Sequence, residues 1–162
     1  MKTFVTLLLL YLACLSLCDV TENNVTVHAP QDKIWQYLSS VKNFESLNIV
    51  AIDVVEHPVE NPNKRKFTLT EEIPILHFFR KKVVSECSWD MTPSVLINQT
   101  VINDSGLDVN VIVRLQPNGE KTTVTHRITI TNGDFIKRTF AVKTSRDIQL
   151  SWLQNLNKVF IK

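Results

Sequence analysis

The chain ends in an amphipathic segment from about Ser145 to Ile161, and this segment constrains the fold more than any other. Its apolar residues recur every three or four positions, which is the spacing of one face of an α-helix. They are Ile148, Trp152, Leu153, Leu156, Val159 and Phe160. An apolar face must be covered, and the only large surface available is the strand-like region before it. We therefore predict a long C-terminal helix, with Ser145 as its N-cap, packed against a sheet.

The region from Phe67 to Thr131 alternates apolar and polar residues, as antiparallel strands do when one face is buried. The segment Leu107 to Leu115 alternates strictly, and Asn118-Gly119 after it is a strong hairpin signal. Pro74 is expected to interrupt an earlier strand. The pattern predicts a sheet with one apolar face turned toward the terminal helix.

Residues 1–18 have the composition of a secretory signal peptide. Lys2 supplies positive charge, and residues 5–17 are nearly all apolar. Cys18 provides the small side chain that precedes a signal-peptide cleavage site. The apolar run is shorter than the roughly 20 residues that span a bilayer. We therefore expect cleavage near Asp19 rather than a retained anchor, and an extracellular protein.

The remaining segment, 19–162, suits one domain with its own core. Cys14 and Cys18 fall in the signal segment, so Cys87 is the single cysteine of the mature chain and no intramolecular disulfide is possible. Without Lys2 the chain has 17 basic and 16 acidic residues, a formal charge of +1. This balance indicates neither a nucleic-acid nor an anionic-membrane partner.

Three glycosylation sequons agree with export. They begin at Asn24, Asn98 and Asn103, and none has proline in the middle position. We expect all three asparagine side chains to face solvent, with Asn98 and Asn103 on the outer face of the sheet.

The segment from Val25 to Leu38 combines a short strand, an alanine-proline step and a tryptophan-bearing helix, and a second helix or turn follows around Phe44 and Leu47. This order, completed by the Asn118-Gly119 hairpin and the terminal helix, resembles the START-like (SRPBCC) helix-grip superfamily, which includes polyketide-cyclase-like proteins. The resemblance implies an α+β fold. In that fold a curved antiparallel sheet of about six to seven strands wraps around a long C-terminal helix, with two short helices after the first strand.

Members of that superfamily mostly bind lipids, sterols or aromatic natural products under the terminal helix, and a minority are enzymes. The glycine-rich loop of the plant members has no counterpart here, since the chain has only Gly106, Gly119 and Gly133. The inward faces of the predicted strands and helix then give the candidate ligand-binding residues. They are Phe67, Leu69, Phe79, Trp89, Gln99, Val111, Val113, His126, Ile128, Phe140, Trp152 and Leu156. We expect Phe140 and Trp152 to lie near the mouth.

Polar residues on the inward faces are the candidates for orienting a ligand, because an unpaired buried polar group costs about 1–3 kcal/mol. They are Glu71, Lys81, Ser85, Gln99 and His126. The competing interpretation has three parts: His126 is a satisfied core histidine, Lys81 reaches water along its stem, and the strand registers are off by one.

No metal or cofactor site is predicted. His28, His57, His77 and His126 lack the i, i+3 or i, i+4 helical spacing of metal ligands, and Cys87 gives no paired thiolates. Cys87 also lies mid-strand on an apolar face, where a thiol is typically an inert small hydrophobe.

These observations favour a secreted, non-enzymatic carrier of a small hydrophobic or amphipathic ligand, such as a lipid, sterol or aromatic metabolite, held between the sheet and the terminal helix. Two alternatives stay open. One is a cyclase- or hydrolase-type enzyme that uses the same cavity with His126 as its base, and the other is a protein-interaction module with a filled core. We expect a monomer, without a nucleic-acid partner and without membrane insertion after signal cleavage.

Overall fold

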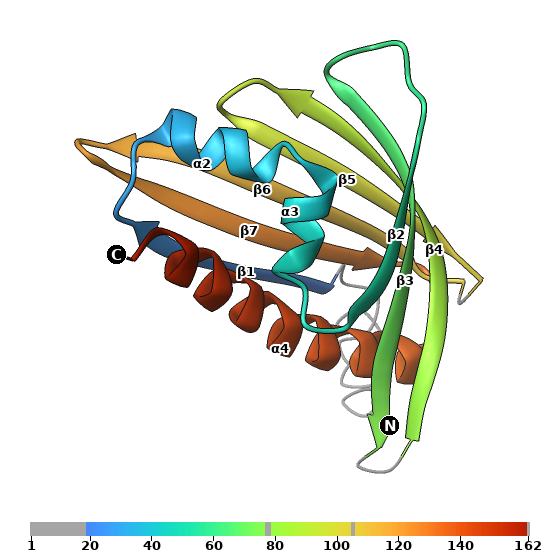
Figure 1. Ribbon diagram of the computed structural model, residues 1–162. Helices are drawn as coiled ribbons and strands as arrows, with labels where there is room; N and C mark the ends of the chain where they lie inside the picture. Colours follow the sequence, from blue (N-terminus) through green and yellow to red (C-terminus); the bar gives the residue numbers. More distant parts are fainter. Residues whose placement is uncertain (1–18, 77–78, 105, 162) are drawn as a thin grey trace, which may run out of the picture.

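The computed structural model describes residues 19–76, 79–104 and 106–161, so the predicted signal segment lies outside it. Within these residues ten elements follow one another along the chain (Figure 1). They are β1 (Asp19–Val27), α2 (Gln31–Leu38), α3 (Val41–Ser46), β2 (Ala51–His57), β3 (Lys64–Leu76), β4 (Phe79–Thr92), β5 (Leu96–Asn103), β6 (Asp108–Asn118), β7 (Lys121–Thr131) and α4 (Phe135–Phe160).

The strands form one antiparallel sheet of seven strands in the order β1-β7-β6-β5-β4-β3-β2. Strands β2 to β7 pair with their neighbours in sequence, whereas β1 pairs with β7 and so brings the start of the domain beside its last strand. The sheet curves around α4, and α2 and α3 lie on its concave side (Figure 1). The predicted helix-grip architecture is confirmed.

Helix α4 begins eleven residues earlier than predicted. Its N-cap is Asp134, whose carboxylate accepts a hydrogen bond of 2.9 Å from the backbone N–H of Lys137, so the assignment of Ser145 as the cap was wrong. The chain turns into the helix through Asn132 and Gly133, which both have positive φ. Val159 is also not part of the buried stripe, because 43% of it is exposed. Among the described residues, no helix combines the length and apolar character needed to cross a bilayer.

The C-terminal half of α4 is held by the two short helices. The Trp152 indole packs on the Phe44 ring of α3 with a centroid distance of 5.1 Å, and its Nε1–H donates to the Phe44 carbonyl oxygen at 3.3 Å. Near the end of α4, Phe160 meets Tyr37 of α2 edge to face at 5.8 Å. Asn155 donates from Nδ2 to the Leu47 carbonyl at 3.2 Å. These contacts close the core at one end of the helix.

Aromatic side chains fill this closed part of the core. The Trp89 ring lies 4.9 Å from Phe44 and 5.4 Å from Phe67, both in edge-to-face geometry that favours aromatic pairs. Val113 and Leu156 are buried in the same cluster. The sheet and helix therefore interlock fully here.

Three details of the predicted strands differ from the structure. β1 starts at Asp19, several residues before the predicted short strand around Val25, because it pairs with β7 along its whole length. β3 continues through Pro74, where the pairing register shifts, so the proline does not end the strand. The turn after β6 is one residue further on than Asn118-Gly119, since Asn118 still pairs with Lys121 and only Gly119 has positive φ.

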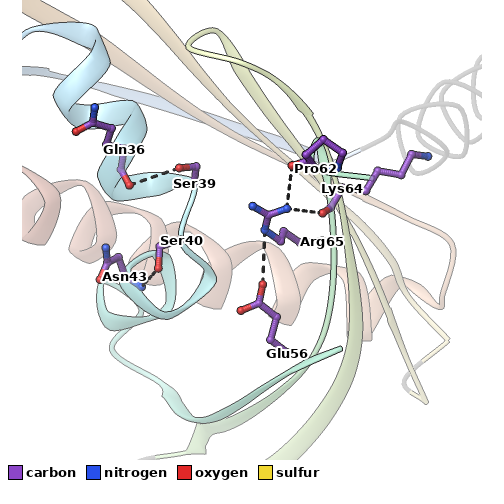
Figure 2. A network of polar contacts seen from close by, with 8 residues as sticks. All are labelled: Gln36, Ser39, Ser40, Asn43, Glu56, Pro62, Lys64 and Arg65. Atoms are coloured by element: carbon purple, nitrogen blue, oxygen red, sulfur yellow. Dashed lines mark hydrogen bonds and ion pairs between the residues drawn. The ribbon is translucent and has the colours of Figure 1, made fainter. Parts of the chain in front are cut away.

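Polar contacts hold two regions in place, the start of α3 and the β2–β3 hairpin (Figure 2). The Ser40 hydroxyl caps α3 by accepting from the backbone N–H of Asn43 at 3.5 Å. In the β2–β3 hairpin, Arg65 donates from Nη1 to the carbonyls of Pro62 and Lys64 at 2.9 and 2.7 Å, and its Nε lies 3.5 Å from a Glu56 carboxylate oxygen. The loop with its two prolines is thereby tied back to its own strands.

We expect Asp134→Ala to lower the melting temperature by a few degrees, because the first N–H groups of α4 lose their cap. Ser145→Ala should have little effect, since Ser145 lies inside the helix. Thermal unfolding followed by circular dichroism measures both, and Asp134→Asn, which keeps a capping oxygen, serves as the control. Equal effects of Asp134→Ala and Ser145→Ala would contradict this helix boundary.

Candidate functional site

A cavity of about 450 Å³ lies between the concave face of the sheet and the helices α3 and α4. Strands β3 to β7 form its floor, and residues from both helices cover it. This volume is within the range of about 300–1,000 Å³ found for small-molecule sites. The sheet and α4 therefore pack closely at the C-terminal end of the helix only, and a cavity lies between them toward its N-terminal end.

The exposure of successive α4 residues shows which end of the cavity is open. Trp152 and Gln149 line it and are buried, at 2% and 0% exposed. Phe140 and Lys137 also line it but are exposed, Phe140 at 38%. The cavity is thus closed beside Trp152 and opens toward the N-terminal turns of α4. The expected position at the mouth is correct for Phe140 and wrong for Trp152.

Seven of the twelve predicted ligand-binding residues line the cavity. They are Leu69, Gln99, Val111, His126, Ile128, Phe140 and Trp152. Four others lie in the filled part of the core, where packing leaves them no cavity surface: Phe67, Trp89, Val113 and Leu156. Phe79 stands at the first position of β4 and is 67% exposed, because the end of that strand extends beyond the layer it was expected to contact. Ligand contact at any of these residues stays a prediction.

The predicted inward faces of the strands agree with the structure. Of the five polar residues expected to point inward, Glu71, Lys81, Gln99 and His126 line the cavity. Ser85 lies on the same face between them and is buried, and its hydroxyl has no hydrogen-bond partner among the described residues. A register error of one residue would have turned all five outward.

His126 is held by Gln149, a residue that the sequence interpretation missed. The Gln149 amide nitrogen donates to His126 Nδ1 at 3.1 Å and to the His126 carbonyl at 2.5 Å, while its oxygen accepts from Asn23 Nδ2 at 2.5 Å. Since Nδ1 accepts, the ring proton resides on Nε2. Gln149 precedes Trp152, Leu153 and Leu156 by three, four and seven residues, so its place on the buried helix face was readable from spacing.

His126 is poorly suited to act as a general base at neutral pH. Burial disfavours its charged form and lowers its pKa to about 3. Its ring also packs against the Trp152 ring, tilted by 50°, at a centroid distance of 4.9 Å. A neutral imidazole with Nδ1 occupied can donate a hydrogen bond from Nε2, but a base that works near pH 7 needs a pKa near 7.

Two carboxyl groups meet at the α3 end of the cavity. Glu45 of α3 is only 5% exposed, and its Oε2 has no hydrogen-bond partner within the described part of the chain. Glu71 of β3 accepts a hydrogen bond of 2.8 Å at Oε1 from Asn48, and all three residues line the cavity. Burial, reinforced by the Glu71 charge, raises the pKa of Glu45 to about 8. Burial also raises the pKa of Glu71, although the Asn48 bond opposes it.

Glu45 was also missed by the sequence interpretation. It follows Val41 by four residues and stands beside Phe44, so it shares the inward face of α3 with both. A carboxylate on an otherwise apolar helix face is the signal that identifies it. Charged residues are seldom buried without a partner, and such an exception indicates a functional group.

Cys87 and the histidines provide neither a reactive thiol nor a metal site among the described residues. Burial raises the pKa of the Cys87 thiol to about 12, which leaves it protonated and unreactive at neutral pH. Within the described residues no three His, Cys, Asp or Glu side chains gather in the manner of a metal site. His77 lies outside these residues.

The three sequon asparagines occupy different environments. Asn24 is exposed, as expected. Asn98 points to the outer face but is half-buried, and its side-chain oxygen accepts from Asn110 at 2.8 Å. Asn103 was expected on the outer face and instead lines the cavity, because it is two residues from Val101 and four from Gln99 on the same strand face. Glycosylation at any of the three stays a prediction.

Solved structures with the same fold are similar to this chain over most of its length. The Zhui aromatase/cyclase from Streptomyces sp. R1128 superposes with a TM-score of 0.76 at 13% identity, covering 88% of this chain and 93% of that one. The di-domain aromatase/cyclase StfQ of steffimycin biosynthesis gives 0.74 at 15% identity, covering 90% of this chain and 51% of StfQ. A START superfamily protein from Mycobacterium smegmatis gives 0.67 at 11%, covering 86% and 98%.

These likenesses show the START-like helix-grip fold. At the level of sequence, no protein-family profile and no curated protein matches the chain.

The buried carboxyl of Glu45 should make stability depend on pH. Its pKa rises from 4.5 to about 8 on folding, so its stabilising protonated state is fully present below pH 4.5 and is lost as the pH rises toward 8. We expect the free energy of unfolding to fall across this window by up to about 1.4 kcal/mol per pH unit. In Glu45→Gln this slope should shrink, leaving the part due to Glu71.

Urea unfolding at a series of pH values measures the slope. Glu60→Gln removes an exposed carboxylate from the β2–β3 loop and controls for the loss of one negative charge. An unchanged slope in Glu45→Gln would show that Glu45 is solvated.

Proposed function

We propose that this protein is a secreted, monomeric carrier of a small hydrophobic or amphipathic molecule, held in the cavity between the sheet and α4. The observation that supports it most is the cavity itself, a space of about 450 Å³ that is closed at one end and whose mainly apolar surface also carries polar side chains. Small-molecule sites have this composition, because apolar walls supply affinity and few polar groups fix orientation.

Apolar burial is the expected source of affinity. Val111, Ile128 and Ile148 from strands and helix line the cavity around its middle. Each Å² of ligand surface removed from water there contributes about 25 cal/mol before the ordering costs of binding are subtracted. Polar groups near the closed end, such as Gln99 and His126, would then select the ligand's orientation.

The structures with the same fold support a small-molecule role and also keep an enzymatic alternative open. Two of them are described as aromatase/cyclases. In this chain the group that favours catalysis is Glu45, because a carboxyl with a pKa near 8 is protonated at neutral pH and can serve as a general acid. That alternative requires turnover that Glu45→Gln abolishes while ligand binding persists. The third possibility, a protein-interaction module with a filled core, is disfavoured by the hollow.

Filling the cavity should abolish binding. Ala141 lines the cavity from α4, so Ala141→Trp places an indole in the ligand's space. Protein purified from a eukaryotic host should carry a co-purifying apolar molecule, detected by native mass spectrometry and solvent extraction, and Ala141→Trp should lose it. Lys143→Trp, on the exposed side of the same helix, is the matched control.

The same spectra give the oligomeric state. If the protein neither retains an apolar ligand nor takes one up on exchange, the carrier proposal fails.

Secretion is tested separately by expression of the full chain in a eukaryotic cell. We expect the protein in the medium, with its mass reduced by removal of residues 1–18 and with glycans that a peptide N-glycosidase releases. Intracellular retention of an uncleaved chain would contradict this proposal without affecting the ligand-binding one.

A further inference from the structure

The closed end of the cavity carries two carboxyl groups without a positive partner. Glu45 and Glu71 project into it from α3 and β3, and the Asn48 amide is the single side-chain hydrogen-bond donor that they have among the described residues. No ion pair of the described residues includes either carboxyl. The buried thiol of Cys87 is close enough to feel the charge of both. This arrangement leaves several carboxyl oxygens for a guest.

The other titratable groups that line the cavity do not supply the missing charge. His126 of β7 is neutral because it is buried. Lys81 of β4 and Lys137 of α4 are exposed, so their ammonium groups are solvated, and Asp104, after β5, is itself acidic. A buried carboxylate without a partner is strongly disfavoured, so burial favours the protonated form of Glu45.

Resting on the proposed ligand-binding function, we propose that the cavity selects an apolar primary amine, whose ammonium group lies between Glu45 and Glu71 while its apolar body fills the space below α4. An ammonium group has three N–H donors, which match the unpartnered Glu45 Oε2 and the further oxygens of the pair. A hydroxyl offers one donor and no charge. A metal ion fits less well, because no third acidic, thiol or imidazole ligand gathers here in the described chain.

Binding of the amine would favour the ionised form of Glu45, whose carboxyl is otherwise kept protonated by burial. At neutral pH the Glu45 proton leaves to solvent as the ammonium enters, so amine binding is coupled to proton release. Amine affinity should therefore rise from pH 6 to pH 8, whereas the affinity for a neutral ligand with the same body should not rise. Charge-assisted hydrogen bonds in a water-poor site are roughly twice as strong as neutral ones, which makes the distinction measurable.

The test uses three probes with the same apolar body: 2-(2-naphthyl)ethylamine, the matching alcohol and the matching carboxylic acid. Isothermal titration calorimetry at pH 8 should show the amine binding at least about tenfold more tightly than the alcohol, with the acid weakest. Titrations in phosphate and Tris at pH 7 should show release of up to about one proton for the amine and none for the alcohol.

The double variant Glu45→Gln, Glu71→Gln should remove the preference for the amine and the proton release while it still binds the alcohol. Glu72→Gln, which removes a carboxylate that pairs with Arg80 outside the cavity, should keep both effects. Circular dichroism confirms that each variant is folded.

The outcomes separate the two proposals. If the alcohol binds as tightly as the amine, or the acid binds best, the amine inference is wrong and the carrier function stands. If none of the probes binds the wild-type protein, and no other apolar ligand is retained, both are wrong. The proton count in the wild-type protein tests the inference without any substitution.

Discussion

The sheet and α4 pack closely at one end of the helix and not at the other, and the other properties of the structure follow from this constraint. At one end Trp152 packs on Phe44 of α3, and Phe160 packs on Tyr37 of α2. Here the helix is in direct side-chain contact with the two short helices. The sheet is curved and wraps around the helix (Figure 1), and toward the first turns of the helix the two layers enclose the cavity. A rigid helix over a curved sheet cannot stay in contact along its full length, and the space that results is the cavity.

The same constraint explains which parts of the helix could be predicted. Where α4 touches a filled core, it needs a continuous apolar stripe, and Trp152, Leu153 and Leu156 reveal it. Where α4 covers the cavity, Ala141 and Val142 still pack against the core, but polar residues share the inward face of the helix. Ile136 is 78% exposed there, and Thr144 and Ser145 line the cavity. The N-terminal turns therefore lack the periodic signal, and the predicted start was eleven residues too late.

The strands were more predictable than the site they build. Period-two alternation assigns each side chain to a face, so Gln99 and His126 could be placed on the inner surface from sequence alone. Alternation does not say how far along the strand the opposite layer extends, which is why Phe79 and Trp89 share a face of β4 but differ completely in exposure. Glu45 was not predicted for another reason. Removing a carboxylate from water is costly, so an acidic residue is expected to be exposed unless the helix face on which it lies is considered.

The hydrogen bond between Asn23 and Gln149 joins residues separated by 126 positions, and with it the first strand is locked to the last helix. During synthesis the sheet leaves the ribosome before the helix that covers its concave side, so the apolar face stays uncovered until residues 135–160 have emerged. Contacts of such long sequence separation form slowly. The nascent chain is therefore expected to depend on chaperones in the interval, and truncations that remove the C-terminal segment should aggregate rather than yield a smaller folded protein.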